Sequence, residues 1–172
     1  MGPEVRGRYL ILVACLLAPV GLNAADATPQ EAGREIGAIL AWRLGPEAVE
    51  EHCRAADPDG AGMRKQALNA WFRKNEALIK EVDTRVAEIV PLLQRPSPGV
   101  DPVGAVRDQV KKMLIESAFE GKTPEETTTL CKAEAVPDAH RWNNNGMPHV
   151  QQSLAALNDW QVRRGENQAQ AR

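Results

Sequence analysis

Residues 60–93, GAGMRKQALNAWFRKNEALIKEVDTRVAEIVPLL, carry the strongest secondary-structure signal in the chain. Apolar side chains recur there at steps of three and four, the spacing that places them on one face of a helix. They are Ala67, Trp71, Leu78, Val82, Val86, Ile89 and Leu93. The opposite face carries Arg73, Lys74, Lys80, Glu81 and Glu88. This division predicts one long amphipathic helix from about residue 60 to residue 90, with Pro91 ending it or kinking its last turn.

Two shorter helices are predicted upstream of this stretch. Thr28-Pro29-Gln30-Glu31 has the spacing of a capping box and opens the first helix. Gly45-Pro46 is expected to stop it, because glycine favours a helix end and proline cannot continue the hydrogen-bond ladder. A second, short helix is then expected from residue 46 to about residue 56, and it carries Cys53.

Three more helices are predicted downstream of a proline-rich connection at residues 95–99. One follows Asp101-Pro102, a short one follows a second capping box at residues 123–126 and carries Cys131, and one begins at Pro148. The period-2 alternation that is typical of strands is absent. The sequence therefore predicts an all-α protein, a single compact bundle of about five to six helices with one long central helix.

Residues 1–24 are predicted to be a cleavable secretory signal peptide. Two arginines precede an apolar run of about ten residues, YLILVACLLA, and small residues follow it. We expect cleavage after Ala24 or after Ala27. The less favoured alternative is an uncleaved membrane anchor, since the run is well short of the roughly 20 apolar residues that a span needs. The protein is therefore expected to be exported, to a periplasm foremost or else as a secreted protein.

The cysteines agree with export. Cys15 lies inside the signal and should leave with it, so that Cys53 and Cys131 remain as an even pair far apart in the sequence. We predict that they form one structural disulfide, worth about 4.5 kcal/mol in the chain-entropy model. Two independent buried thiols, or a redox pair that lacks a C-x-x-C spacing, are the alternatives. A lipoprotein acylated at Cys15 is another, although the apolar run continues beyond that residue.

Charge and length narrow the possible function classes. The chain of 172 residues has 21 Lys and Arg against 23 Asp and Glu, for a formal net charge of −2. Both signs are interspersed, so the long-range positive field on which nucleic-acid binding depends is missing. We expect no nucleic-acid partner and no stable membrane span after signal cleavage. One helical domain is predicted over residues 28–163, followed by a disordered polar tail at residues 164–172.

Residues that could carry chemistry form no recognisable pattern. His52, His140 and His149 match no zinc-binding spacing. The serines lack a nucleophile elbow, and no glycine-rich loop could cradle a phosphate. We therefore expect no metal, no cofactor and no enzymatic activity.

Asn75 is the first of two candidate binding sites. It falls on the apolar face of the long helix, between Trp71 and Leu78. A buried Asn costs stability unless its amide is hydrogen-bonded. Its side chain either bonds a neighbouring helix end or fixes the register of the helix, or it contacts a ligand or partner beside Trp71 and Phe72.

The second candidate is the connection between the last two helices, His140-Arg141-Trp142-Asn143-Asn144-Asn145-Gly146. Trp and Arg dominate interface hot spots, whereas Asn and Gly provide adaptable polar contacts on loops. The predicted partner-binding residues are His140, Arg141, Trp142, Asn143, Asn144 and Asn145. Alternatively, Trp142 covers the core and the asparagines serve only as turn and cap residues.

A small exported helical domain of this kind is best interpreted as a protein that binds another protein without catalysis. An inhibitor, an immunity factor or an accessory subunit would fit. The alternative is a periplasmic stress-type chaperone or a metal-handling helical protein, which should present an exposed apolar or basic concave face. A hydrolase whose site is assembled from residues distant in the sequence is the third hypothesis.

Overall fold

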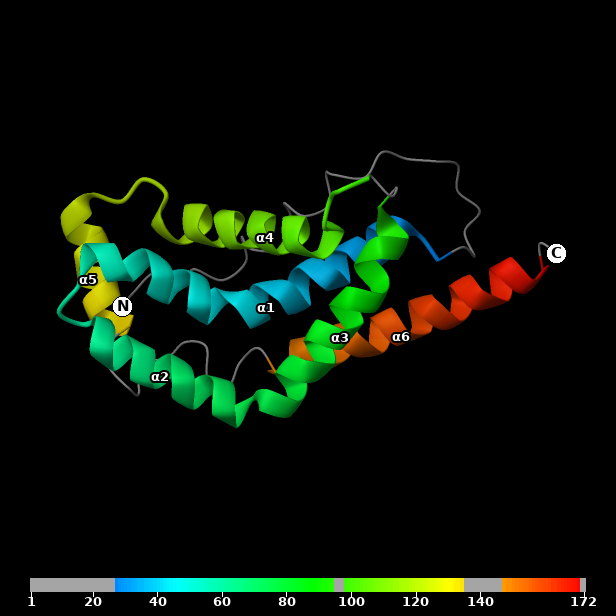
Figure 1. Cartoon of the computed structure of the whole chain (residues 1–172), viewed down its shortest axis with the longest axis horizontal. Coiled ribbons are helices and arrows are strands. Elements are labelled where there is room, and N and C mark those ends of the chain that lie inside the picture. Colours follow the sequence, from blue (N-terminus) through cyan, green and yellow to red (C-terminus); the bar gives the residue numbers. More distant parts are fainter. Residues whose placement is uncertain (1–26, 95–97, 135–146, 171–172) are drawn as a thin grey trace, which may run out of the picture.

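The computed structural model describes residues 27–94, 98–134 and 147–170 (Figure 1). Its helices are α1 (Pro29–Ala56), α2 (Ala61–Lys74), α3 (Glu76–Leu93), α4 (Pro102–Phe119), α5 (Pro124–Glu134) and α6 (Met147–Gln170). The described part of the chain contains no strand, so the predicted all-α bundle is confirmed. No helix among the described residues is long and apolar enough to cross a membrane. The predicted signal peptide lies outside the described residues.

Helix α1 is the central element, and it contacts each of the other five helices. In Figure 1 it runs through the middle of the molecule between α4 and α2, while α5 lies at one end and α3 and α6 lie toward the other. The main core is formed by α1, α3, α4 and α6, and its most deeply buried members include Ile39, Leu40, Val82, Ile89 and Leu157. A smaller cluster, formed by Val49, Cys53 and Cys131, joins α1 to α5. The predicted long central helix therefore exists, but it is α1.

The predicted stop at Gly45-Pro46 is wrong, because α1 continues through both residues as one helix. Proline removes one backbone hydrogen bond from a helix interior and costs about 3 kcal/mol there. Leu44, Ala48 and Val49 are all buried on either side of it. Burying a Leu or Val side chain contributes about 1.5–3 kcal/mol each, so the packing of α1 outweighs the local preference for a break.

The predicted single helix from residue 60 to residue 90 is also wrong, since Asn75 divides it into α2 and α3. Asn75 has φ −109° and ψ 14°, and it ends α2. Its side-chain Nδ2 donates a hydrogen bond to the carbonyl oxygen of Trp71 at 2.9 Å. Asparagine competes for backbone hydrogen bonds in this way and therefore favours helix ends over helix interiors. The bond is made within the helix that Asn75 itself ends, and not to a neighbouring helix end as the sequence had suggested.

The polar C-terminal residues form the end of α6 as far as Gln170, where the sequence predicted a disordered tail. Two arginines attach this part of the helix to the bundle. The Arg163 guanidinium lies 3.5 Å from the Glu31 carboxylate, and Arg164 Nη1 donates to the carbonyl oxygen of Leu92 at 3.2 Å. The Arg164 guanidinium also lies over the Trp160 ring, 5.3 Å from its centroid. These contacts stabilise the part of α6 that follows its last buried apolar residue.

Both predicted capping boxes are present. Thr28 Oγ1 accepts from the Glu31 N–H, and the Glu31 carboxylate accepts from the Thr28 N–H, each at 3.2 Å. Thr123 and Glu126 make the same reciprocal pair at 3.2 Å and 2.8 Å. The backbone N–H of Thr123 stabilises the ionised Glu126 carboxylate, and this lowers the pKa of Glu126 below its ordinary value.

The role of Asn75 in ending α2 can be tested by Asn75→Ala. The substitution removes the side-chain hydrogen bond to Trp71, and we expect it to lower the free energy of unfolding by about 1 kcal/mol. Asn69→Ala is the matched control, because Asn69 is exposed on the same helix, and it should change stability by less than about 0.5 kcal/mol. Urea denaturation measures both. Equal effects would show that the Asn75 side chain does not stabilise the helix end.

Candidate functional site

Helix α2 is held against α1 at two points. Among its described residues only Arg64 and Trp71 are buried, and they lie two turns apart on one face. Neither belongs to the two apolar clusters of the bundle. Ala67 and Leu68, which lie between them on the same face, are partly exposed. The two attachment points and the short side chains between them define the site.

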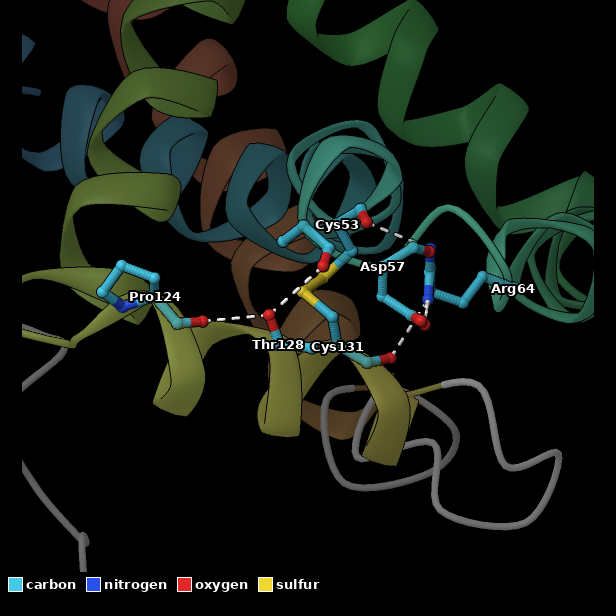
Figure 2. The surroundings of a disulfide bond; sticks show 7 residues. Cys53, Asp57, Arg64, Pro124, Thr128 and Cys131 are labelled. Atoms are coloured by element: carbon cyan, nitrogen blue, oxygen red, sulfur yellow. Dashed lines mark hydrogen bonds and ion pairs between the residues drawn. A yellow bond between two sulfur atoms is a disulfide. The ribbon is translucent and has the colours of Figure 1, made fainter.

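The disulfide between Cys53 and Cys131 forms the base of the first attachment point (Figure 2). It links α1 to α5 across 78 positions of sequence, as predicted, and both residues are fully buried. The Thr128 hydroxyl on α5 shares its one proton between the carbonyl oxygen of Pro124, at 2.9 Å, and that of Ala56 at the end of α1, at 3.2 Å. The ends of these two helices are therefore joined covalently and by a hydrogen bond.

The Arg64 guanidinium connects α2 to both joined helices. Its Nη1 donates to Asp57 Oδ2 at 2.5 Å and to the carbonyl oxygen of Cys131 at 3.2 Å. Its Nη2 donates to the carbonyl oxygens of Cys53 at 3.1 Å and Asp57 at 2.5 Å. Figure 2 shows the guanidinium facing Asp57 beside the two half-cystines. Arginine has five N–H donors, and the fifth, on Nε, has no partner among the described residues.

An aromatic cluster forms the second attachment point. The rings of Trp71 on α2 and Trp42 on α1 are tilted against each other, with centroids 5.0 Å apart. Phe72 packs edge-on against Trp71, and the Arg43 guanidinium lies 5.2 Å from the centroid of the Phe72 ring. The indole Nε1 atoms of Trp42 and Trp71 are buried and have no hydrogen-bond partner within the described part of the chain. A buried donor without a hydrogen-bond partner costs about 1–3 kcal/mol. The indole N–H of a buried Trp usually has a partner.

A cleft lies between the two attachment points. Its walls are formed by Pro46, Val49 and Glu50 of α1, Arg64, Ala67, Leu68 and Trp71 of α2, and Glu134 at the end of α5. The cleft is open to solvent, and the space within it is about 30 Å³. A space of this size holds about two water molecules.

The charged groups around the cleft are largely paired with one another. Glu50 is buried, and its carboxylate accepts from Arg54 Nη2 at 2.6 Å. This hydrogen bond and the charge of Glu50 hold the pKa of Arg54 above its ordinary value. Arg64 is paired in the same way with Asp57. The cleft thus has an apolar wall, and Glu50 and Arg64, which also line it, are each held in an ion pair.

Trp71 is the predicted binding residue that lines this cleft. Asn75 lies one turn further along, buried and bonded to the Trp71 carbonyl oxygen, and its predicted contact with a partner stays a prediction. The six predicted contact residues at positions 140–145 lie outside the described residues. Arg64 was missed, although it shares the helix face of Ala67 and Trp71. A charged residue on an apolar face was the signal that could have found it.

The described residues contain no group of three or more His, Cys, Asp or Glu side chains that could hold a metal ion. A scan against protein-family models found no match for the chain, and neither did searches of curated proteins and of solved structures.

The tight packing around Arg64 can be tested at Gly60. A Cβ at this position would overlap Asp57 Oδ2 and lie 2.6 Å from Arg64 Nη1, so that Gly60→Ala must displace the buried ion pair. We expect the substitution to lower the free energy of unfolding by about 1–3 kcal/mol, the usual cost of overpacking.

Gly62→Ala is the control for this experiment, because a Cβ there meets nothing within 4 Å. Gly62 lies in α2, so alanine should leave stability unchanged or raise it by up to about 1 kcal/mol. Guanidinium denaturation of both variants provides the comparison. A Gly60→Ala variant as stable as Gly62→Ala would show that the ion pair can move freely.

The contribution of the disulfide is measured with the double variant Cys53→Ala/Cys131→Ala. Loss of the cross-link should lower the free energy of unfolding by roughly 2–4 kcal/mol, because the unfolded chain regains its freedom. Thermal and chemical denaturation of the double variant and of the oxidised protein, both without a reducing agent, give this difference in the free energy of unfolding. A double variant as stable as the oxidised protein would contradict a structural role for the bond.

Proposed function

We propose that this chain is a small exported helical protein that binds another protein without catalysing a reaction, in the manner of an inhibitor, an immunity factor or an accessory subunit. Export is supported by the signal-like N-terminal sequence and by the buried disulfide, since such bonds persist in oxidising compartments. The contact surface includes the cleft between α1 and α2.

One observation carries this proposal: a small open cleft between two buried anchor residues, Arg64 and Trp71. Trp and Arg are the residue types most enriched in interface hot spots, which cluster around desolvated pockets. Both side chains are already fixed, Arg64 by four hydrogen bonds and Trp71 by packing on Trp42. A preformed site of this kind loses little conformational entropy when a partner binds.

The absence of catalysis is proposed from the state of the ionisable groups in the cleft. A general acid or base must exchange a proton with a substrate and must be free to reach it. Glu50 is occupied by Arg54, and Asp57 by Arg64. These groups are arranged to neutralise each other and to hold the helices.

The proposed surface is tested by filling the cleft with Ala67→Trp. Ala67 lines the cleft, so the added indole should block entry and abolish binding of the partner. Ala70→Trp is the matched control, because Ala70 is exposed on the same helix and is not among the lining residues. Quantitative mass spectrometry compares what each immobilised, oxidised variant retains from the exported fraction of the source cells.

A protein retained in stoichiometric amounts by wild type and Ala70→Trp, but not by Ala67→Trp, would support the proposal. Equal retention by all three would show that the cleft is not the contact surface. Suppression of the aggregation of an unfolded substrate by all three proteins, without a stoichiometric partner, would favour the chaperone alternative instead.

A further inference from the structure

Helix α5 is attached to the bundle mainly at one residue. Of its 11 residues, all of which the structure describes, only Cys131 is buried. Leu130, its one large aliphatic side chain, is partly exposed and belongs to neither apolar cluster. Among the described helices, α1 is the one against which α5 packs extensively, and Figure 1 shows α5 at one end of the molecule. The apolar surface that holds α5 is therefore small.

The sequence of α5 also makes a weak helix. Isolated helices shorter than roughly 12–15 residues are marginal in water, and α5 is shorter than this. Its centre is Thr127, Thr128 and Thr129, and β-branched side chains have a low helix propensity. The Thr128 and Thr129 hydroxyls each donate to a carbonyl oxygen one turn earlier at 2.9 Å, which slightly destabilises a helix. The capping box at Thr123 stabilises the first turn only, so α5 depends on its contacts with the bundle to stay helical.

The disulfide is the strongest contact that holds α5 in place. It joins Cys131 covalently to Cys53 on α1, and Figure 2 shows the two weaker contacts beside it. Arg64 Nη1 donates to the Cys131 carbonyl oxygen at 3.2 Å, and the Thr128 hydroxyl reaches the Ala56 carbonyl oxygen at 3.2 Å. Both hydrogen bonds require α5 to lie where the disulfide places it.

The rest of the bundle is held together without α5. The main core contains residues of α1, α3, α4 and α6 but none of α5. Arg64 has three further hydrogen bonds to Cys53 and Asp57 at the end of α1, so α2 keeps its attachment when α5 leaves. The end of α4 is held separately, because Phe119 stacks on His52 of α1 with ring centroids 4.2 Å apart. Departure of α5 would therefore leave the other helices assembled.

We propose that the disulfide between Cys53 and Cys131 is a redox switch for α5. In the oxidised chain the bond holds α5 against α1, and in the reduced chain α5 is released from a bundle that is otherwise folded. The reductant is a dithiol. One of its thiolates attacks a half-cystine sulfur and forms a mixed disulfide, and its second thiolate displaces the cysteine of the chain and closes the S–S bond of the oxidised reductant. Cys53 and Cys131 thereby gain two electrons and two protons.

The switch controls whether an apolar surface is covered. Val49 on α1 and Phe119 on α4 belong to the cluster that contains the disulfide, and both lose the cover of Cys131 when α5 leaves. The Cys53 thiol becomes accessible at the same place. Disulfides persist in oxidising compartments and are reduced in others, so the surface is covered in the first and uncovered in the second. This inference goes beyond the proposed function and does not depend on it.

Amide hydrogen exchange of the full chain, followed by NMR, tests the switch with dithiothreitol as the reductant. In the oxidised chain the amides of Leu130 and Lys132 should exchange at least about 100-fold more slowly than those of an unstructured peptide. In the reduced chain they should exchange within about 10-fold of the unstructured rate, because undocked α5 is too short to stay helical. The amides of Leu40, Ile89 and Leu157 in the main core should stay protected at least about 100-fold in both states.

The reactivity of the thiols gives a second measurement. Both half-cystines are fully buried while α5 is docked. Iodoacetamide should therefore modify Cys53 and Cys131 of the reduced chain in buffer within about 10-fold of the rate in urea, and peptide mapping assigns the label. Cys53→Ala/Cys131→Ala is the control variant. Its α5 should exchange as in the reduced wild type, and dithiothreitol should cause no further change.

Two results would overturn the inference. If Leu130 and Lys132 stay protected by more than about 100-fold after reduction and both thiols stay unreactive, noncovalent contacts are sufficient to hold α5. If Leu40, Ile89 and Leu157 lose their protection together with α5, the bond supports the whole fold and does not act on α5 alone. The capture experiment with Ala67→Trp uses the oxidised chain, so its result is independent of both.

Discussion

The arrangement of α1, α2 and α5 depends on the buried guanidinium of Arg64. Of its four hydrogen bonds, three go to Cys53 and Asp57 at the end of α1 and one goes to the carbonyl oxygen of Cys131 on α5. Carbonyl groups near a helix C-terminus carry partial negative charge, so a cation is stabilised there. The Cys53 carbonyl oxygen accepts from Arg64 in addition to the Asp57 N–H. The disulfide fixes the two half-cystine carbonyls relative to each other. Because Arg64 spans both, the covalent bond between α1 and α5 also determines where α2 lies.

The helical fold could be predicted from the spacing of apolar residues and from the capping residues. The course of the helices at Pro46 and at Asn75 could not. At Pro46, the burial of apolar residues on both sides outweighs the local cost of a proline inside a helix. Only the local cost is visible in the sequence. At Asn75 the break leaves the phase of the apolar pattern unchanged. The Asn75 N–H still bonds the Trp71 carbonyl oxygen, and its own carbonyl oxygen still accepts from Ile79. An apolar stripe that continues in register across a break is indistinguishable, in the sequence, from one helix.

The candidate site was predictable only in part. Trp71 was singled out from its place on the apolar face, and the disulfide followed from an even number of cysteines outside the signal. The partners of Arg64 are mostly backbone carbonyl oxygens, which no residue letter identifies. The cleft itself depends on which residues of α1 stand opposite Ala67 and Leu68, and this is a property of tertiary packing. Helical spacing shows which residues share one face of a helix, but it does not show which other helix packs against that face.

The cleft persists because closing it would cost more than it gains. The space in the cleft is only about 30 Å³, so filling it is worth at most about 0.7 kcal/mol at the usual 24 cal/mol per Å³. Closing it requires α2 to move toward α1, and this would break hydrogen bonds of Arg64, each worth about 1.5–3 kcal/mol because the donor is charged. An apolar residue in place of Arg64 could be equally stable, since buried ion pairs often contribute little net stability. The hydrogen bonds of Arg64 therefore fix the position of α2 beside α1, with the cleft between the two helices.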